Sequence, residues 1–557
     1  MDENIMIKDI LSSYDEIEML NEEEDIIFFK CKEKVYGIWY FKKESKTRNP
    51  IIVVKNDESY DYPHILPLEI PLDNDKKDKY RILCLHESGS TIKYLQSYEE
   101  KIIDIVDRLI ELLSLSPIEI EKEFQKEFLY YWNDQTHNKP SMKLYIGSER
   151  EFMKMNVYMN PDAEIRIVSN GIKLNDKEKM IDGKKVWRHL PEFPVYFIPI
   201  TDNKRVLPPT RDNEWTINNL LQIIQGRDYR RISHDTYTKI SQEKIKTARI
   251  GLVFEMLVDS SSINFCCLIT FSNANVNTLL NKLKNEISKI EITKSKRVDF
   301  YHLSKQIGND TSIIDKKVLL IGAGSLGSYV ATELVKAGIR NLTIYDSDTL
   351  GEDNLLRHTI KELWVGATKA GALKYDLERI HPEVFVKPVI KDITIETLRE
   401  ELHNYNMIIF TVGSSDVQLE CNDLLKHEKF DKPVIYAWLE AGGTNSHILT
   451  VNYTKIGCFE CLYTDTEGNL INNKANMLSD EFVEARTIRN GCGATRVAYG
   501  TEILLRTTSV ILDTIKKLLK DEIKENTLVD IDPSAVIVQG NKFIEGKCHC
   551  CGDRDIE

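Results

Sequence analysis

The sequence predicts an α/β protein of several domains. A chain of 557 residues is too long for one hydrophobic core and favours roughly two to four domains. The apolar run KVLLI, residues 317–321, leads at once into glycines and a helix-forming stretch, as in domains built on parallel strands. Residues 24–85 are rich in strand-forming runs and precede an amphipathic helix, which indicates an α+β domain. Runs such as ARIGLVFEMLV and INFCCLITF predict a strand-rich α+β region between them.

Composition and charge exclude several classes of function. The net charge of −13 argues against general binding of nucleic acid or of acidic membranes. The first twenty residues are acidic and lack the basic and apolar parts of a secretion signal, and no run of about 18 apolar residues occurs. Eleven cysteines, an odd number, fit a reducing compartment. We expect a cytoplasmic protein that binds neither nucleic acid nor membrane.

The glycine-rich segment KVLLIGAGSLG predicts a Rossmann-like domain in the C-terminal part of the chain. Gly322, Gly324 and Gly327 have G-x-G-x-x-G spacing, and the helix-forming stretch SYVATELVKAGI follows. Glycines permit a tight turn, and the helix N-terminus then offers N–H groups to phosphate. Most matches to this fingerprint bind dinucleotides for redox chemistry.

Polar residues placed after the next strands point away from redox chemistry. Asp346 ends the strand NLTIY-D, at about the distance where an acidic residue meets a ribose hydroxyl. Asn354, Arg357 and Lys369 follow, and a third strand, MIIF, leads to Asp416. Hydride transfer has no need of such a cluster, whereas cleavage of a nucleoside triphosphate needs cations on the phosphates and a magnesium ligand. Taken singly, Asn354 or Lys369 fits a solvated loop equally well.

Two cysteine pairs predict a zinc site. Cys458 and Cys461 form C-F-E-C, and Cys548 and Cys551 are the outer pair of C-H-C-C. Four thiolates from two such pairs suit tetrahedral zinc, which would tie the C-terminal tail to the domain. Cys550 is surplus, so the spacing used at the tail stays open, and free thiols are the alternative.

Residues 310–521 resemble the adenylating domain of the ubiquitin-activating superfamily (ThiF, HesA and MoeB-like proteins), which includes the thiamine- and molybdopterin-pathway activating proteins. The resemblance implies that the glycine loop receives ATP, that Asp346 holds the ribose and that Arg357 and Lys369 grip phosphates. It also implies magnesium on Asp416 and a zinc at the two cysteine pairs. Cys492, in RNGCGATRVAYG, fits the loop cysteine that attacks the acyl adenylate in thioester-forming members, although a small helix-packing residue is the alternative.

The N-terminal region resembles the ubiquitin-conjugating fold. Strands, the Tyr62–Pro67 bend, Cys84 at the end of a short strand and an amphipathic helix, SYEEKIIDIVDRLIELLSLSP, occur in that order. In that family the cysteine matching Cys84 accepts the acyl group and passes it to an amine. The family's His-Pro-Asn before the cysteine is missing here, so the oxyanion-stabilising group is unassigned. Taken alone, Cys84 is by default a packed strand cysteine, and the activating domain on the same chain favours the catalytic interpretation.

The order of domains resembles bacterial fused activating–conjugating enzymes of anti-phage CBASS systems. We expect a conjugating-like domain at 1–136, a linker domain at 137–305 and an adenylating domain at 306–557. The implied partners are a protein whose C-terminus is activated (a nucleotidyltransferase or ubiquitin-like protein), a target lysine and a second copy of the adenylating domain. The alternatives are a sulfur-carrier activating enzyme, a non-enzymatic scaffold and an NAD-dependent oxidoreductase.

The middle region offers no motif with a chemistry of its own. Cys266 and Cys267 lie in an apolar run and are expected in the core. The arginines at 227, 230 and 231 are expected on a solvated surface, with donation of an arginine in trans as the alternative. The stretch NTLLNKLKNEISKI predicts a helix over 277–290.

Overall fold

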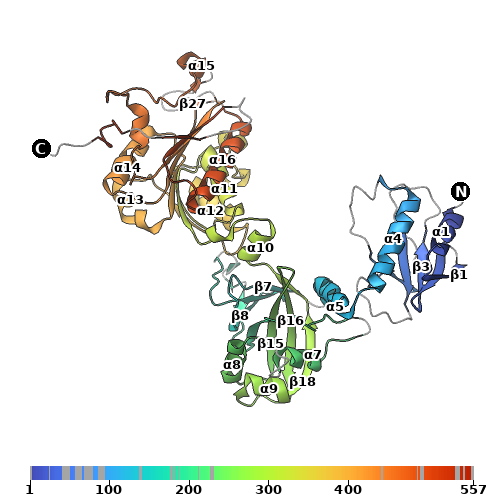
Figure 1. Cartoon of the computed structure of the whole chain (residues 1–557). Coiled ribbons are helices and arrows are strands. Elements are labelled where there is room, and N and C mark those ends of the chain that lie inside the picture. The colour runs from blue at the N-terminus through green and yellow to red at the C-terminus, as the bar shows by residue number, and fades with distance from the viewer. Residues whose placement is uncertain are drawn as a thin grey trace. The chain divides into compact units, whose positions relative to one another are not determined.

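The computed structural model divides the chain into two compact units. The first comprises Met1–Leu144, Glu149–Ser169 and Arg188–Arg297, and the second comprises Tyr145–Ser148, Asn170–Trp187 and Val298–Glu557. The structure describes all residues except 1–2, 24, 41–49, 57–64, 68–78, 86–94, 137–140, 176–179, 182–183, 186, 211–212, 226–230, 441–442, 486, 490–494, 498, 533–539, 544–545 and 553–557. Figure 1 labels the elements used below.

The N-terminal part is an antiparallel sheet with two helices packed against its core. The strand order is β1-β2-β3-β4-β6-β5, and the bounds are β1 Ile17–Glu23, β2 Ile26–Cys31, β3 Lys34–Trp39, β4 Ile51–Lys55, β5 Ile65–Pro67 and β6 Tyr80–Leu83. Helices α1 (Glu3–Ser12) and α4 (Tyr98–Leu113) bury apolar side chains in the same cluster as β2, β3 and β4. Ser97 and Glu100 form a capping box that fixes the start of α4.

Two details of this part differ from the sequence-based expectation. Helix α1 and strand β1 precede the strands that the sequence predicts. Residues 62 and 63 lie outside the described part of the chain, but Pro67 lies in a strand and not in a bend. Strand β5 is the edge strand, where a proline without an N–H group costs the ladder least.

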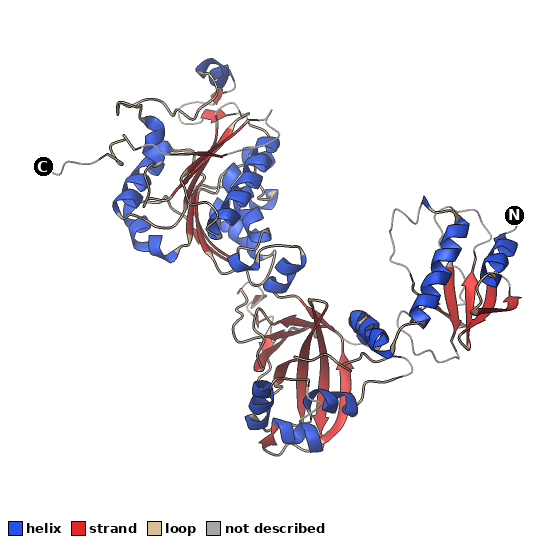
Figure 2. Ribbon diagram, viewed as in Figure 1, coloured by secondary structure: helices blue, strands red, loops and turns tan. Residues whose placement is uncertain are grey.

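The middle region is a nine-stranded mixed sheet with helices around it, shown in red and blue in Figure 2. Its strands are β7 Met142–Tyr145, β8 Met153–Met159, β9 Ile165–Val168, β12 Arg188–His189, β13 Val195–Pro199, β15 Arg249–Val258, β16 Ser261–Phe271, β18 Ile287–Thr293 and β19 Ser295–Arg297. Its helices are α5 Pro117–Lys126, α6 Phe128–Asp134, α7 Ile217–Ile224, α8 His234–Gln242 and α9 Leu279–Asn285. The short ladder of β14 Lys244–Ile245 with β17 Asn277–Thr278 completes it. A second short ladder, β10 Met180–Ile181 with β11 Lys184–Lys185, lies in the segment Asn170–Trp187, which belongs to the second compact unit.

The structure tests several predictions for the middle region. Cys266 and Cys267 are buried in β16, as expected. The predicted helix over 277–290 is too long, because α9 ends at Asn285 and the following residues pair with β16 as β18. Arg231 forms an ion pair with Asp202, whereas positions 227 and 230 lie outside the described residues.

The C-terminal part has the Rossmann-like arrangement that the sequence predicts. Its sheet has the order β22-β21-β20-β23-β24-β25-β28-β29, and the first five of these strands are parallel. The strands are β20 Lys317–Ile321, β21 Asn341–Tyr345, β22 Phe385–Val389, β23 Met407–Phe410, β24 Val434–Leu439, β25 Ser446–Val451, β28 Thr527–Ile531 and β29 Gly540–Lys542. The helices are α10 Phe300–Gln306, α11 Ser325–Lys336, α12 Lys369–Glu378, α13 Ile395–Glu401, α14 Ser415–His427, α15 Asp480–Ala485 and α16 Thr501–Leu519.

Both faces of this sheet are covered, which explains its continuous apolar strands. Along β20, Val318 and Leu320 join the core cluster under α11, α12 and α16, whereas Leu319 and Ile321 join the cluster under α13 and α14. This alternation with helices on both sides is the rule for parallel sheets. The strand order reverses between β20 and β23, so their carboxyl ends diverge into the crevice where such folds bind ligands.

Among the described residues, no helix is both long and apolar enough to span a bilayer.

Candidate active site

The glycine loop turns sharply at the end of β20 and leads into α11. Gly322 has a φ of +97°, in the left-handed region that favours glycine, and a Cβ there would lie 3.0 Å from the backbone nitrogen of Val412. A Cβ at Gly327 would lie 2.0 Å from the carbonyl oxygen of Gly322. Gly324 is the N-cap of α11 and makes no side-chain cap. The loop therefore needs glycine at 322 and 327, and the first N–H groups of α11 are not capped by a side chain.

Asp346, directly after β21, is bound to that loop. Its carboxylate accepts hydrogen bonds from the backbone N–H of Ala323, at 2.6 Å, and of Asp348, at 2.9 Å. Burial of the carboxyl raises its pKa. The sequence places Asp346 at this edge, but its contact with the loop is visible only in the structure.

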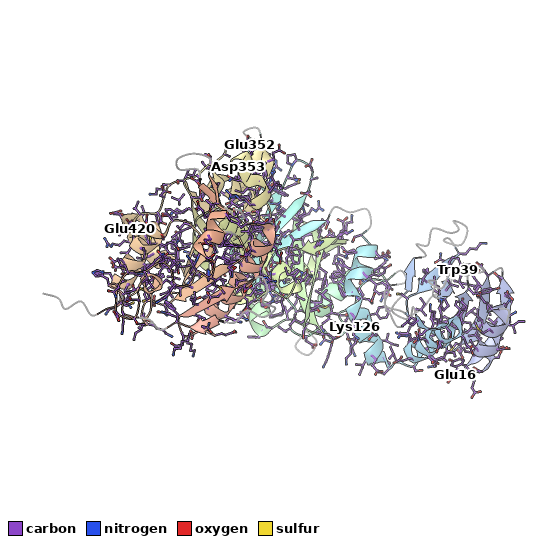
Figure 3. The ribbon with its side chains drawn as sticks, turned by 90° about the horizontal axis from the view of Figure 1, so that it is seen from above. Glu16, Trp39, Lys126, Glu352, Asp353 and Glu420 are labelled. Carbon is purple, nitrogen blue, oxygen red and sulfur yellow. The ribbon has the colours of Figure 1, made fainter. Side chains whose placement is uncertain are left out.

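The three polar residues predicted after Asp346 have different surroundings: Asn354 has a structural role, whereas Lys369 and Arg357 are cations. Asn354 lies in the 3₁₀ helix η3 (Glu352–Arg357), where Figure 3 labels Glu352 and Asp353, and its Oδ1 accepts from the N–H of Gly351 at 3.1 Å. Lys369 begins α12, and its buried ammonium group lies 2.7 Å from the exposed carboxylate of Asp348.

Arg357 is the cation that faces the glycine loop. Its guanidinium carbon lies 5.6 Å from the ring centre of Tyr499, and its Nη1 lies 3.4 Å from the tyrosine hydroxyl. That hydroxyl donates in turn to Ser325, at the start of α11, at 2.9 Å. The Nε of Arg357 is buried without a hydrogen-bond partner among the described residues. Arg357 is thus positioned by an aromatic ring and keeps a free donor.

A pocket of about 950 Å³ opens at the carboxyl ends of β20, β23 and β24. Of the residues predicted from the sequence, Gly324 and Arg357 line it. Asp416 lies in the first turn of α14 and is exposed; its neighbour Ser415 lines the pocket. The other lining residues are Ser325, Leu326, Thr411, Val412, Gly413, Gln418, Ala437, Trp438, Leu439, Glu440, Phe459, Tyr463, Asn472, Asn473, Asn476, Leu478 and Tyr499.

The part of this pocket beside the end of β24, called its outer part below, contains residues that the sequence does not single out. Glu440 follows β24 and accepts hydrogen bonds from His447 Nε2, at 2.6 Å, and from the N–H groups of Met477 and Leu478. His447 Nδ1 lies 2.6 Å from Asp530, so the buried imidazole bridges two carboxylates that raise its pKa against the effect of burial. Glu440 occupies the same strand-end position as Asp346, which is the one sequence feature that marks it.

His358, beside Arg357, gives the stability of the domain a dependence on pH. Burial, followed by the charges of Lys369 and Arg357, lowers the pKa of His358 to about 4. The unfolded chain, with a pKa of about 6.5, binds its proton first on acidification, so acid favours unfolding between these values. We expect the free energy of unfolding of His358→Gln to fall about 2 kcal/mol less than that of the wild type between pH 7 and about pH 5. Urea unfolding at both pH values measures this, with the exposed His427→Gln as control; equal losses in His358→Gln and wild type would contradict it.

The two cysteine pairs converge on one point. The sulfur atoms of Cys458, Cys461, Cys548 and Cys551 all lie within 4.8 Å of one another. Four of the sulfur–sulfur distances run from 3.4 to 4.0 Å, and the sulfurs of tetrahedral zinc sites lie ~3.8 Å apart. Cys550 is not in this set; its sulfur accepts from Asn422 at 3.4 Å. The donors and their spacing fit zinc.

The two cysteines predicted to carry acyl groups are placed unequally. Cys84 directly follows β6 and is half-buried. The carbonyl of its neighbour Leu85 accepts from Arg108 of α4 at 3.3 Å, which fixes the chain beside the helix. Cys492 lies outside the described residues; the antiparallel strands β26 (Thr487–Arg489) and β27 (Thr495–Val497) flank it.

The C-terminal part of the chain matches a family model, and several known proteins are similar to the chain in sequence. Residues 304–548 match the ThiF family. The ATP-dependent ubiquitin transferase-like protein Cap2 of Enterobacter hormaechei is 38% identical over 107 residues, which cover 19% of this chain and 18% of that protein. Cap2 of Pseudomonas aeruginosa is 25% identical over 169 residues, covering 30% of each protein. The molybdopterin-synthase adenylyltransferase of Escherichia coli is 38% identical over 113 residues, covering 20% of this chain and 40% of that one.

The matched segments thus span less than half of these three relatives. The family match covers the glycine loop, the polar cluster after β21 and three of the four cysteines, Cys458, Cys461 and Cys548. Residues 304–548 match the ThiF family, and this part of the chain is similar to MoeB-like adenylyltransferases and to Cap2.

Proposed function

We propose that this protein uses ATP to activate the C-terminal carboxylate of a partner protein and then transfers the acyl group to an amine. The carboxylate attacks the α-phosphate of ATP, which gives an acyl adenylate and pyrophosphate. A cysteine thiolate displaces AMP from the acyl carbon, and a second cysteine takes the acyl group by thioester exchange. A lysine amine then displaces that thiolate and forms an amide. Each step exchanges one acyl bond for another, so one ATP suffices.

The single observation that carries the adenylation step is the pocket beside the glycine loop. Its inner end combines uncapped N–H groups of α11 with the unpaired Nε of Arg357, and these are donors suited to phosphate. Its outer end leaves room for the end of a peptide, as a reaction between ATP and a C-terminus requires. The ThiF-family match supports ATP as the nucleotide.

Further residues have proposed roles at the inner end. Asp346 would hold the ribose, and Lys369, released from Asp348, would reach the phosphates. Asp416, exposed at the start of α14, would hold magnesium, whose charge would offset that of the triphosphate. Asn354 would keep η3 in place under Arg357.

The acyl-transfer steps are assigned to Cys492 and then Cys84. The order of elements around Cys84, an antiparallel sheet followed by α4, supports the comparison with conjugating enzymes. The Cap2 relatives, by name ubiquitin transferase-like, support a transferase.

We further propose domains at 1–136, 137–305 and 306–557, with a homodimer formed through the last of these. We also propose zinc at the four cysteines, a cytoplasmic location and a role in anti-phage defence. Candidate partners are a nucleotidyltransferase or a ubiquitin-like protein.

Replacing Cys84 with alanine tests the transfer relay. We expect the variant to release pyrophosphate with its partner and to form a thioester on Cys492, but to form no amide product. Mass spectrometry without reductant, after incubation with ATP, magnesium and candidate partner proteins, identifies which cysteine carries the acyl group. Cys31→Ala, a buried cysteine of β2, is the control and should ligate. Ligation by Cys84→Ala at the wild-type rate would remove Cys84 from the mechanism.

A second function deserves a test because of the molybdopterin-synthase adenylyltransferase match. A sulfur-carrier adenylyltransferase would use the same pocket but deliver the adenylate to a sulfur donor. That function leaves the N-terminal sheet and Cys84 without a role. A reducible acyl thioester on Cys84 favours ligation, whereas conversion of the partner's carboxylate to a thiocarboxylate favours sulfur transfer.

A further inference from the structure

Three residues that line the pocket each bury a polar atom without a partner. These atoms are Nε of Arg357, Oε1 of Gln418 and Nε1 of Trp438, and none has a hydrogen bond within the described part of the chain. Buried polar atoms in folded proteins are nearly always satisfied, so an unsatisfied set around one pocket is available to the polar groups of a ligand. Arg357 lies beside the glycine loop, whereas Gln418 and Trp438 come from α14 and β24. The last two therefore need a different ligand group.

Gln418 presents an acceptor whose orientation is fixed. Its Nε2 donates to the carbonyl oxygens of Val412 and Ser414, both at 3.1 Å. Two carbonyls can only accept, so the amide cannot be flipped, and Oε1 is the atom left over. The residue is 4% exposed. A ligand N–H group is the partner that this atom lacks.

Trp438 presents a donor on a rigid ring. The indole stacks on His447 with ring centres 5.0 Å apart and meets Phe459 edge-on at 6.2 Å. His447 is itself fixed between Glu440 and Asp530. Since indole Nε1 can only donate, its missing partner is a ligand oxygen.

Among the described residues, the pocket wall around these two groups has little free charge. Arg357 and Glu440 are the charged residues of the lining that the structure describes, and the Glu440 carboxylate already accepts hydrogen bonds from His447 and two backbone N–H groups. The rest of the outer wall consists of aromatic and aliphatic side chains and the amides of Asn472, Asn473 and Asn476. A charged side chain buried here would lose its hydration without gaining an ion-pair partner.

We propose that Gln418 and Trp438 determine specificity by reading the main chain of an extended C-terminal tail whose last residues carry no charge. An extended strand presents N–H and C=O groups alternately along each edge, which matches one fixed acceptor and one fixed donor on a pocket wall. Gln418 accepts from a tail N–H group, and Trp438 donates to a tail carbonyl. This inference rests on the proposed adenylation of a C-terminus, because that reaction brings a peptide to the pocket.

The test uses peptides with the full-length protein. A library of hexapeptides with free carboxylates, acetylated at the other end, is screened for ATP–pyrophosphate exchange. Peptides without acidic or basic residues in their last positions should react best. The most active peptide is then resynthesised with one N-methyl group at each amide in turn. We expect one N-methyl position to slow exchange roughly five- to tenfold with the wild type.

The variants assign that sensitivity to Gln418. Gln418→Met lacks the acceptor, so the parent and N-methylated peptides should react at the same rate. The thermal unfolding temperature of Gln418→Met, measured beside that of the wild type, guards against a folding defect in this variant, because the change also removes the hydrogen bonds to Val412 and Ser414. Trp438→Phe should slow all peptides by a similar factor and leave the N-methyl effect intact. Glu420→Gln, an exposed residue of the same helix labelled in Figure 3, is the matched control and should behave as the wild type.

The outcomes separate this inference from the function on which it rests. Exchange with equal N-methyl sensitivity in wild type and Gln418→Met would overturn the inference and leave adenylation intact. Equal use of charged and uncharged tails would do the same. No exchange with any peptide or with any candidate partner protein would overturn adenylation and the inference together.

Discussion

Replacing Arg357 with alanine is expected to slow partner-dependent ATP–pyrophosphate exchange by about 10²- to 10³-fold, the usual cost of removing one charge-stabilising donor from a transition state. Arg357 combines a free buried Nε with a guanidinium held over Tyr499, and it lines the pocket beside the start of α11. A cation that is held in place before the substrate binds stabilises the charge that develops in the transition state. The loss should therefore appear in kcat as well as in kcat/KM.

Three matched variants make the result specific. Arg357→Lys keeps the charge but loses the planar fork, so it should recover only part of the rate. Tyr499→Phe removes the hydroxyl between Arg357 and Ser325 and should cause a smaller loss. Arg379→Ala removes an exposed arginine that stacks on Tyr375 in the same domain, and it should exchange normally. Wild-type exchange by Arg357→Ala would show that the phosphates bind elsewhere.

Replacing Cys548 with alanine should have the largest effect on stability. The proposed zinc would keep only three of its four thiolates in this variant, and apparent zinc-binding free energies of about 10–16 kcal/mol show how much such a site contributes to folding. We expect the variant to lose its metal and to unfold at a Tm lower by more than about 10 °C. Metal analysis of the purified protein and thermal unfolding measure the two effects.

Cys550 supplies the matched control for that experiment. It lies between Cys548 and Cys551 in sequence, yet its sulfur is outside the four-sulfur set and contacts Asn422. Cys550→Ala should therefore keep one zinc per chain and a Tm near that of the wild type. Loss of zinc in Cys550→Ala but not in Cys551→Ala would mean that the other tail spacing is used.

The C-terminal fold could be predicted because the sequence features that indicate it are local. The apolar strand KVLLI, the glycines after it and the helix after them are contiguous, and the carboxyl ends of parallel strands meet at one edge. Asp346 and Arg357 could therefore be assigned to that edge before their contacts were known. The predicted helix over 277–290 was too long because local propensity alone was used. The segment EISKI is compatible with a helix, but its residues pair with β16 as strand β18.

The outer half of the pocket was not predicted, because nothing local marks it. Gln418 becomes an acceptor only through the carbonyls of Val412 and Ser414, which fix its amide. His447 reads as one polar residue in a buried strand, and its two carboxylate partners come from β24's end and from β28. Pairings set by tertiary packing leave no periodicity or motif in the chain.

The 3₁₀ turn η6, Phe459–Tyr463, contributes both to the four-cysteine cluster and to the wall of the pocket. Cys458 precedes it and Cys461 lies within it, while Phe459 and Tyr463 form part of the pocket wall. Oxidation of these sulfurs, or removal of the proposed zinc by a chelator, would alter the positions of the Phe459 and Tyr463 rings in the pocket wall. We therefore expect mild oxidation to reduce the proposed selectivity among C-terminal tails before it abolishes ATP–pyrophosphate exchange.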